Sequence, residues 1–476
     1  MAQRMIDSVN KNEHKAEQGD IITPKDAAII RFAALLHDIG HLPFSHVGEQ
    51  AYSAVLDDSL SRNVDVGDKV GFKTTDAIRL TSGNLHEQLS ARIIREDKEI
   101  GEAFKEYNSS APPRERIDKD EVAALIEDTS TDQKSFLKSF IHSAIDADRL
   151  DFLSRDSYFV GSNYGRVETE TIIRKLRFVQ VKEGRTPAEE WWELCLDSDA
   201  GLVADHFLLS RFYWYAMLLG QPRILYLDLL TKNVMKYLIN TNRICCIDQL
   251  DKLTIAIREK RHMHEFMELQ DSGVIMAMRR CHNEWDGNDS ISELEKELDT
   301  AIKVLMGGNL AHMFLRKQGL MEHKEYQDTF DSSRLHEAEK CATEELRKQE
   351  KIDKSRAFVK FVHKARNLHV WAPDCRGAEF EEDWRDHVLI KCDRDGHPKC
   401  VPIQLANTNV LHRIGLSRIQ DGNKPKEKSS LVSVSFATFI LWPSTIKEDQ
   451  YSGIEEILNK YFGELTQPFH EELVNG

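Results

Sequence analysis

The sequence lacks the cysteine pairs and long apolar runs that mark several classes of large protein. Its eight cysteines are scattered and no two stand three residues apart, so neither a zinc knuckle nor a disulfide framework is predicted. The longest apolar run, Leu431–Trp442, is interrupted by serine and threonine and is too short to cross a bilayer. The first twenty residues are polar and charged, unlike a secretory signal. We expect a cytoplasmic protein with no membrane partner.

Positive charge is also in deficit. Lysine and arginine total 64 against 79 aspartates and glutamates, which gives a formal net charge of −15. Such a chain does not attract nucleic-acid backbones or anionic membranes over a long range. Any anionic substrate must therefore be held by a local cluster of cations or by a metal ion.

The distribution of residue types along the chain predicts the fold class. A length of 476 residues exceeds one small core, and helical patterns dominate the first two thirds. β-branched and aromatic residues gather between turn signals in Ala357–Trp371, Asp386–Cys392 and Leu431–Trp442. We therefore predict a mainly α protein, with a helical catalytic core over residues 1–309 and a smaller C-terminal α+β lobe over residues 310–476.

The most informative segment is Leu36–His46 (LHDIGHLPFSH), which holds three histidines and one aspartate. It follows a predicted buried helix, Ala27–Leu36, which Thr23 and Pro24 introduce as cap and first-turn residue. A His-Asp pair at a helix end can turn an imidazole nitrogen and a carboxylate toward one ion, and this mixed ligand set suits Mn, Fe, Zn or Mg. The plainer alternative is that polar residues simply collect at a helix end.

A second constellation, Ile145–Asp156, sets four aspartates among apolar helix positions. Asp148, Phe152 and Asp156 follow one another at four-residue spacing and share a helix face. Buried carboxylates are costly unless they are paired or bind a metal. The alternative is that these acids form ion pairs with the neighbouring arginines.

Together these segments resemble the HD superfamily, and specifically its deoxynucleoside triphosphate triphosphohydrolases. The resemblance rests on HDIGHLPFSHVGE at 37–49, HEQ at 86–88 and IDADRLDFLSRDSYFVG at 145–161, in that order, and covers roughly residues 1–300. It implies an HD-domain helical bundle that releases a deoxynucleoside and intact triphosphate. Two alternatives remain open: an HD phosphodiesterase or nuclease acting on another phosphate ester, and a nucleotide-binding regulator with an incomplete metal site.

The resemblance also assigns roles to individual residues. It implies that His37, Asp38 and Asp148 bind one divalent or transition metal ion. It makes His46 and His86 the histidines beside the reacting phosphate. The remaining assignments are Glu49 as the acid that orients this histidine pair, His41 as a pocket histidine, Asp156 at the sugar hydroxyl, Phe152 at the place of a tyrosine near the sugar, and Arg149 and Arg211 as contacts to the phosphates.

Three of these assignments have structural alternatives. His41 could cap a carbonyl, Arg211 could be an ion-pair partner, and His86 with its neighbouring glutamate could open a helix. The family's first histidine ligand would fall just before Met1, so we expect a missing upstream segment, with His14 as a poor substitute. The resemblance further implies a homo-oligomer and a regulatory nucleotide bound between subunits.

Overall fold

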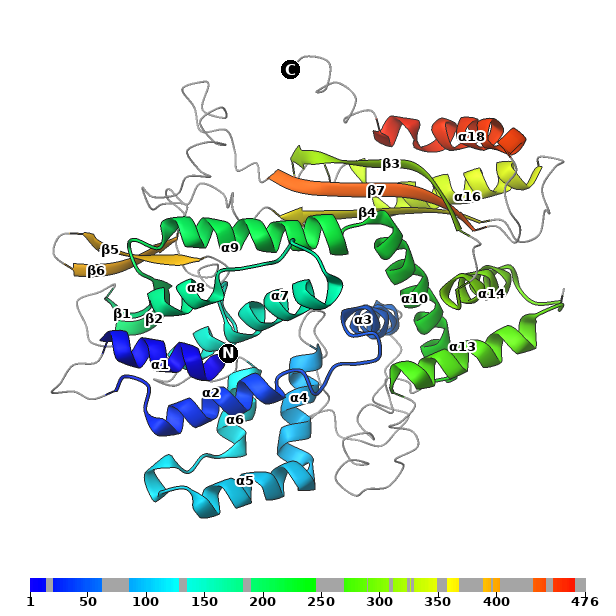
Figure 1. The fold of residues 1–476 in the computed structure, drawn as a ribbon. Coiled ribbons are helices and arrows are strands. Elements are labelled where there is room, and N and C mark those ends of the chain that lie inside the picture. Colours follow the sequence, from blue (N-terminus) through cyan, green and yellow to red (C-terminus); the bar gives the residue numbers. More distant parts are fainter. Residues whose placement is uncertain are drawn as a thin grey trace. The chain divides into compact units, whose positions relative to one another are not determined.

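The computed structural model describes most of the chain, and helices predominate in it (Figure 1). The predicted mainly α fold with a smaller α+β part near the C-terminus is confirmed. None of the helices in the described part has the length and apolar composition that a membrane crossing requires. The described residues are 1–13, 20–61, 85–127, 135–182, 190–244, 269–288, 290–307, 311–322, 326, 329–348, 358–367, 388–394, 397–402, 431–441 and 448–466.

The chain forms two compact units, each built from separate stretches of sequence. The first comprises Met1–Gly40, His86–Leu218 and Leu368–Ser430, and the second comprises the stretches between and after these. The predicted boundary between residues 309 and 310 stays a prediction.

The first unit is helical, with one small sheet. Its helices are α1 (Ala2–Glu13), α2 (Pro24–Leu36), α4 (Leu85–Glu96), α5 (Lys98–Ser110), η1 (Pro113–Glu115), α6 (Lys119–Ile126), η2 (Ser135–Phe140), α7 (Ala147–Val160), α8 (Thr169–Lys175) and α9 (Gly201–Tyr213). The sheet has the order β1-β2-β5-β6, with β1 (Leu176–Lys182), β2 (Glu190–Leu196), β5 (Leu389–Arg394) and β6 (His397–Pro402).

The starts of the two helices that matter most here follow local chemistry. Thr23 caps α2 by accepting the backbone N–H of Asp26, and Pro24 occupies the first turn. Asp146 caps α7 by accepting the backbone N–H of Arg149. At the other end of α7, Gly161 adopts the left-handed conformation that stops a helix. These caps place the ends of α2 and α7 at defined residues.

The second unit joins helices to a three-stranded antiparallel sheet of order β3-β7-β4, in which α16 and α18 lie beside the strands (Figure 1). Its elements are α3 (His46–Ser61), α10 (Pro222–Asn240), α13 (Asp271–Trp285), α14 (Glu293–Leu305), β3 (Ala311–Glu322), α16 (Ser332–Lys348), β4 (Phe358–Asn367), β7 (Leu431–Leu441) and α18 (Glu448–Thr466). A short π-helix, Trp214–Leu219, precedes α10.

The core of this lobe lies between the sheet and its helices. Val359 and Phe361 of β4 are buried with Leu346 of α16 and Leu458 and Phe462 of α18. Burial of such large apolar side chains supplies most of the favourable free energy of the lobe.

Some predicted elements need correction. The apolar spacing of residues 134–158 predicts one long helix, but the structure has two, because η2 ends at Phe140 and α7 begins at Ala147 after the cap at Asp146. The charged sequence of residues 286–350 predicts helix throughout, and this prediction is wrong at strand β3, which separates α14 from α16. His14 lies outside the described residues.

Candidate metal centre

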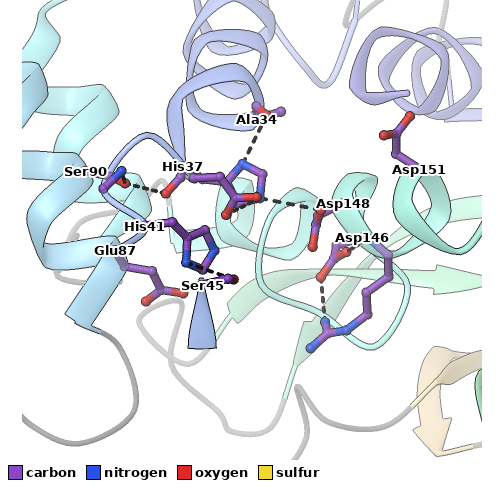
Figure 2. Close-up of polar contacts among 12 residues, drawn as sticks. Ala34, His37, His41, Ser45, Glu87, Ser90, Asp146, Asp148 and Asp151 are labelled. Carbon is purple, nitrogen blue, oxygen red and sulfur yellow. Dashed lines mark hydrogen bonds and ion pairs between the residues drawn. The ribbon is translucent and has the colours of Figure 1, made fainter. Parts of the chain in front are cut away.

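The HD dyad lies at the C-terminal end of α2. His37 is the C-cap residue, and its Nδ1 lies 3.1 Å from the carbonyl oxygen of Ala34, which accepts the Nδ1 proton (Figure 2). With the proton on Nδ1, the lone pair of Nε2 is left to accept a cation. The Nε2 atom is buried and makes no hydrogen bond of ordinary length within the described residues.

Two carboxylates converge on this nitrogen. His37 Nε2 lies 3.3 Å from Asp38 Oδ1. The same nitrogen lies 3.6 Å from Asp148 Oδ1, and Figure 2 shows His37 facing Asp148. Ligands bound about 2.0–2.2 Å from one ion stand roughly 3–3.6 Å apart, so these separations fit a single metal ion. The predicted set of His37, Asp38 and Asp148 is thus brought together within one unit, on α2 and α7.

The charge around His37 also fits a cation. Burial lowers the pKa of His37, but hydrogen bonding and charge from Asp148, together with the charge of Asp38, outweigh it and raise the pKa above its ordinary value. Two carboxylates therefore draw positive charge to this ring, and a metal ion can take the place of the proton.

Asp146 and Arg149 support the start of α7. The Asp146 carboxylate is almost fully buried, accepts the backbone N–H of Arg149 at 2.7 Å and contacts the Arg149 guanidinium at 2.5 Å. Burial raises the pKa of Asp146 to about 6, although the Arg149 charge opposes this. Arg149, predicted to contact phosphates, is therefore held in place by an acid that was not assigned a role. The Asp-Ala-Asp sequence before an apolar helix was the available signal, because aspartate is a preferred N-cap residue.

The second unit carries a histidine cluster at the start of α3. Glu49, which is buried, lies 2.9 Å from His41 Nδ1 and 3.3 Å from His46 Nδ1. The two imidazole rings meet edge to face with centroids 5.1 Å apart. The predicted contact between Glu49 and His46 is present, and a contact between Glu49 and His41 is added. The pairing of His46 with His86, which lies on α4 of the first unit, stays a prediction.

An unusual backbone turn at Phe44 and Ser45 joins His41 to His46 and Glu49 at the start of α3. Phe44 and Ser45 have positive φ values of 59° and 54°, a conformation that is strained for residues other than glycine. The Phe44 N–H donates to Asp271 of α13 at 2.8 Å. A Cβ at Gly48 would lie 2.0 Å from the Pro43 carbonyl oxygen, so the turn leaves room only for glycine there.

The other predicted substrate residues lie on α7 and α9. Phe152 and Asp156 are half-buried on α7, four and eight residues after Asp148. Asp156 Oδ1 lies 3.4 Å from Arg155 Nε, so the predicted arginine pairing is present for this acid. Arg211 is half-buried in the last turn of α9. All these residues belong to the first unit, and their contact with a nucleotide stays a prediction.

One further cluster of potential ligands lies in the second unit, at His282, Asp286 and Asp299. Lys303 Nζ lies 3.1 Å from Asp286 and 3.2 Å from Asp299. One ammonium group already forms an ion pair with each of these carboxylates, so the cluster is satisfied without a metal ion.

Comparisons with known proteins match the region that carries these side chains. The family model described as the HD domain matches residues 6–155, a range that holds all three converging ligands. The uncharacterized protein YwfO of Bacillus subtilis is 26% identical over 222 residues, which are 47% of this chain and 38% of that protein. An uncharacterized protein of Mycoplasma pneumoniae is 28% identical over 193 residues, 40% of this chain and 37% of that protein. The match therefore spans less than two fifths of the length of these relatives.

A solved structure shares the fold. The crystal structure of a phosphohydrolase from Bacteroides thetaiotaomicron superposes with a TM-score of 0.52 and 18% sequence identity, over 92% of this chain and 84% of that one. The region that matches the HD domain model thus contains the three converging side chains, and the fold is similar to that of the solved structure.

Proposed function

We propose that the chain is a metal-dependent HD phosphohydrolase that cleaves a deoxynucleoside triphosphate into deoxynucleoside and triphosphate. The observation that carries the proposal is the convergence of His37, Asp38 and Asp148, at separations that suit one ion. The HD domain match over residues 6–155 and the fold shared with a protein named a phosphohydrolase support the same class of reaction.

In this proposal, His37, Asp38 and Asp148 hold the ion. When bound, a divalent ion polarises a phosphoryl oxygen and lowers the pKa of a bound water. The ion is Mn, Fe, Mg or Zn, because all four accept mixed imidazole and carboxylate ligands.

The other residues bind the nucleotide and move protons. His46 or His86 donates a proton to the leaving 5′ oxygen, since an imidazole can exchange protons near neutral pH. Glu49 holds His46 in orientation through the contact at 3.3 Å. Arg149 and Arg211 offset the negative charge of the triphosphate tail.

The nucleotide itself contacts a second group of residues. We assign Asp156 to a hydrogen bond from the sugar hydroxyl. Phe152 packs beside the sugar through an apolar ring, and His41 lines the pocket. Because phenylalanine has no hydroxyl to donate, the sugar contact here depends more on Asp156.

A nucleotide panel assayed with added manganese tests this proposal. We expect chromatography to show deoxynucleoside and intact triphosphate as products. Asp148→Ala should lower kcat/KM by about 10³-fold, since loss of a metal ligand removes several kcal/mol of transition-state stabilisation. Asp151→Ala is the matched control, because Asp151 lies on the same helix and is half-exposed in an ion pair with Arg155. Release of nucleoside monophosphate from a cyclic nucleotide or a dinucleotide of the panel would instead support a phosphodiesterase, and binding without turnover would support a nucleotide-binding regulator.

A further inference from the structure

The turn that carries the HD dyad lies directly against helix α4. A Cβ built on Gly40 would stand 2.3 Å from the backbone nitrogen of Ser90 and 2.4 Å from the carbonyl oxygen of His86. Backbone atoms inside a helix cannot move aside as a flexible side chain can. Glycine at position 40 therefore lets the turn reach the backbone of α4.

The hydroxyl of Ser90 bonds to both ends of this turn. Ser90 is fully buried. Its Oγ accepts the Gly40 N–H at 2.8 Å. It also donates to the His37 carbonyl oxygen at 2.5 Å (Figure 2). The hydroxyl thus partners two backbone groups at the end of α2, where helical hydrogen bonds run out.

Two different contacts then fix the dyad. The Ala34 carbonyl sets the rotation of the His37 ring through Nδ1. The Ser90 hydroxyl sets the backbone from which the His37 and Asp38 side chains project. Asp148 projects from α7 and depends on neither contact. The separations of 3.3 and 3.6 Å from His37 Nε2 to the two carboxylates therefore require the dyad turn to keep its place on α4.

We propose that Ser90 is a positioning residue for the metal centre, and that its hydroxyl holds the His37–Gly40 turn so that His37 and Asp38 face Asp148. This inference rests on the proposed function, because it assumes that the three side chains bind an ion. Polar partners that orient metal ligands commonly change metal affinity by about 10–100-fold when they are removed. The same helix carries His86, so the contact also ties a predicted catalytic histidine to the dyad turn.

The test is Mn²⁺ binding by the full chain, measured by isothermal titration calorimetry on wild type and Ser90→Ala. We expect Ser90→Ala to bind Mn²⁺ about 10-fold or more weakly. Ser157→Ala is the matched control: Ser157 is equally buried in the same unit, and its hydroxyl donates to the Leu153 carbonyl within α7. This control should keep wild-type affinity within about 2-fold, because its hydroxyl does not touch the dyad turn.

A second variant displaces the same turn without changing Ser90. Gly40→Ala keeps the Ser90 hydroxyl but pushes the turn away from α4, so its Mn²⁺ affinity should also fall. If Ser90→Ala binds Mn²⁺ as tightly as wild type and Ser157→Ala, the positioning role is wrong and the proposed function stands. If folded wild type binds none of Mn²⁺, Fe²⁺, Mg²⁺ and Zn²⁺, the metal-dependent function fails. A loss of the same size in Ser157→Ala would also overturn the inference, because it would reflect general destabilisation.

Discussion

At the residue scale, Asp146 does more than cap a helix. It caps α7 through the Arg149 backbone and also holds the Arg149 guanidinium from a buried position. We expect Asp146→Ala to lower the free energy of unfolding by roughly 2–3 kcal/mol, because it removes a cap and leaves a partly buried cation without its partner. It should also reduce kcat/KM for an anionic substrate.

Asp118 provides the control for this prediction. Asp118 caps α6 in the same unit through a capping box with Glu121. Both residues are far along the chain from the three proposed metal ligands. Asp118→Ala should cost about 1 kcal/mol of stability and leave kcat/KM unchanged. Urea denaturation and steady-state kinetics on both variants decide the matter. Equal kinetic losses in the two variants would show that Asp146 acts only as a cap.

The candidate ligands were easier to predict from the sequence than the residues that support them. His37 and Asp38 were proposed from their place at a helix end and, with Asp148, from the resemblance to the HD superfamily, and the structure brings the three side chains together. The hydroxyl of Ser90 was not predicted, since its contact with the dyad turn spans 53 residues along the chain and depends on how α4 packs. The contact of Glu49 with His41 was missed for a similar reason, because it requires the positive-φ turn at Phe44 and Ser45.

At the scale of elements, strand β4 carries a buried histidine that makes its lobe sensitive to acid. His363 lies in an aromatic cluster, with its ring stacked 5.0 Å from Phe330 and its Nδ1 2.8 Å from the Tyr326 hydroxyl. Burial lowers the pKa of His363 from 6.5 to about 4. The unfolded chain therefore binds this proton more readily than the folded chain between these two pH values.

Because the unfolded chain binds this proton more readily, acid lowers the free energy of unfolding of the lobe. The stabilising contribution is complete above about pH 6.5 and is lost as the pH falls toward 4, by on the order of 3 kcal/mol. His363→Phe keeps an aromatic ring in the cluster but cannot take up a proton. Urea denaturation of the full chain at pH 7 and pH 4.5 should show a smaller fall in stability for the variant. A fall of equal size in both proteins would contradict this origin.

Element prediction succeeded where local chemistry decides and failed where tertiary pairing decides. β-branched and aromatic residues marked β4 and β7 correctly, since such residues favour strands. Strand β3 was missed because Ala311–Glu322 (AHMFLRKQGLME) is rich in helix-forming residues. It is a strand because it pairs along its length with β7, a partner that follows it by more than a hundred residues. Pairing of that kind overrides local propensity.

At the scale of the whole molecule, the net charge of −15 makes the metal centre central to the proposal. An acidic chain repels a triphosphate at long range, so attraction must come from nearby positive charge. The proposal therefore requires an ion at His37, Asp38 and Asp148. It also requires Arg149 and Arg211 to contact the triphosphate. The length and charge indicated this need, but only the folded chain shows two carboxylates 3.3 and 3.6 Å from one imidazole nitrogen.

The most direct measurement is an anomalous-difference map from crystals of the full chain grown with Mn²⁺. We predict a peak about 2.0–2.3 Å from His37 Nε2 and from one oxygen each of Asp38 and Asp148. A map with no peak among these three side chains, or with manganese only at His282, Asp286 and Asp299, would contradict the assignment of the metal centre.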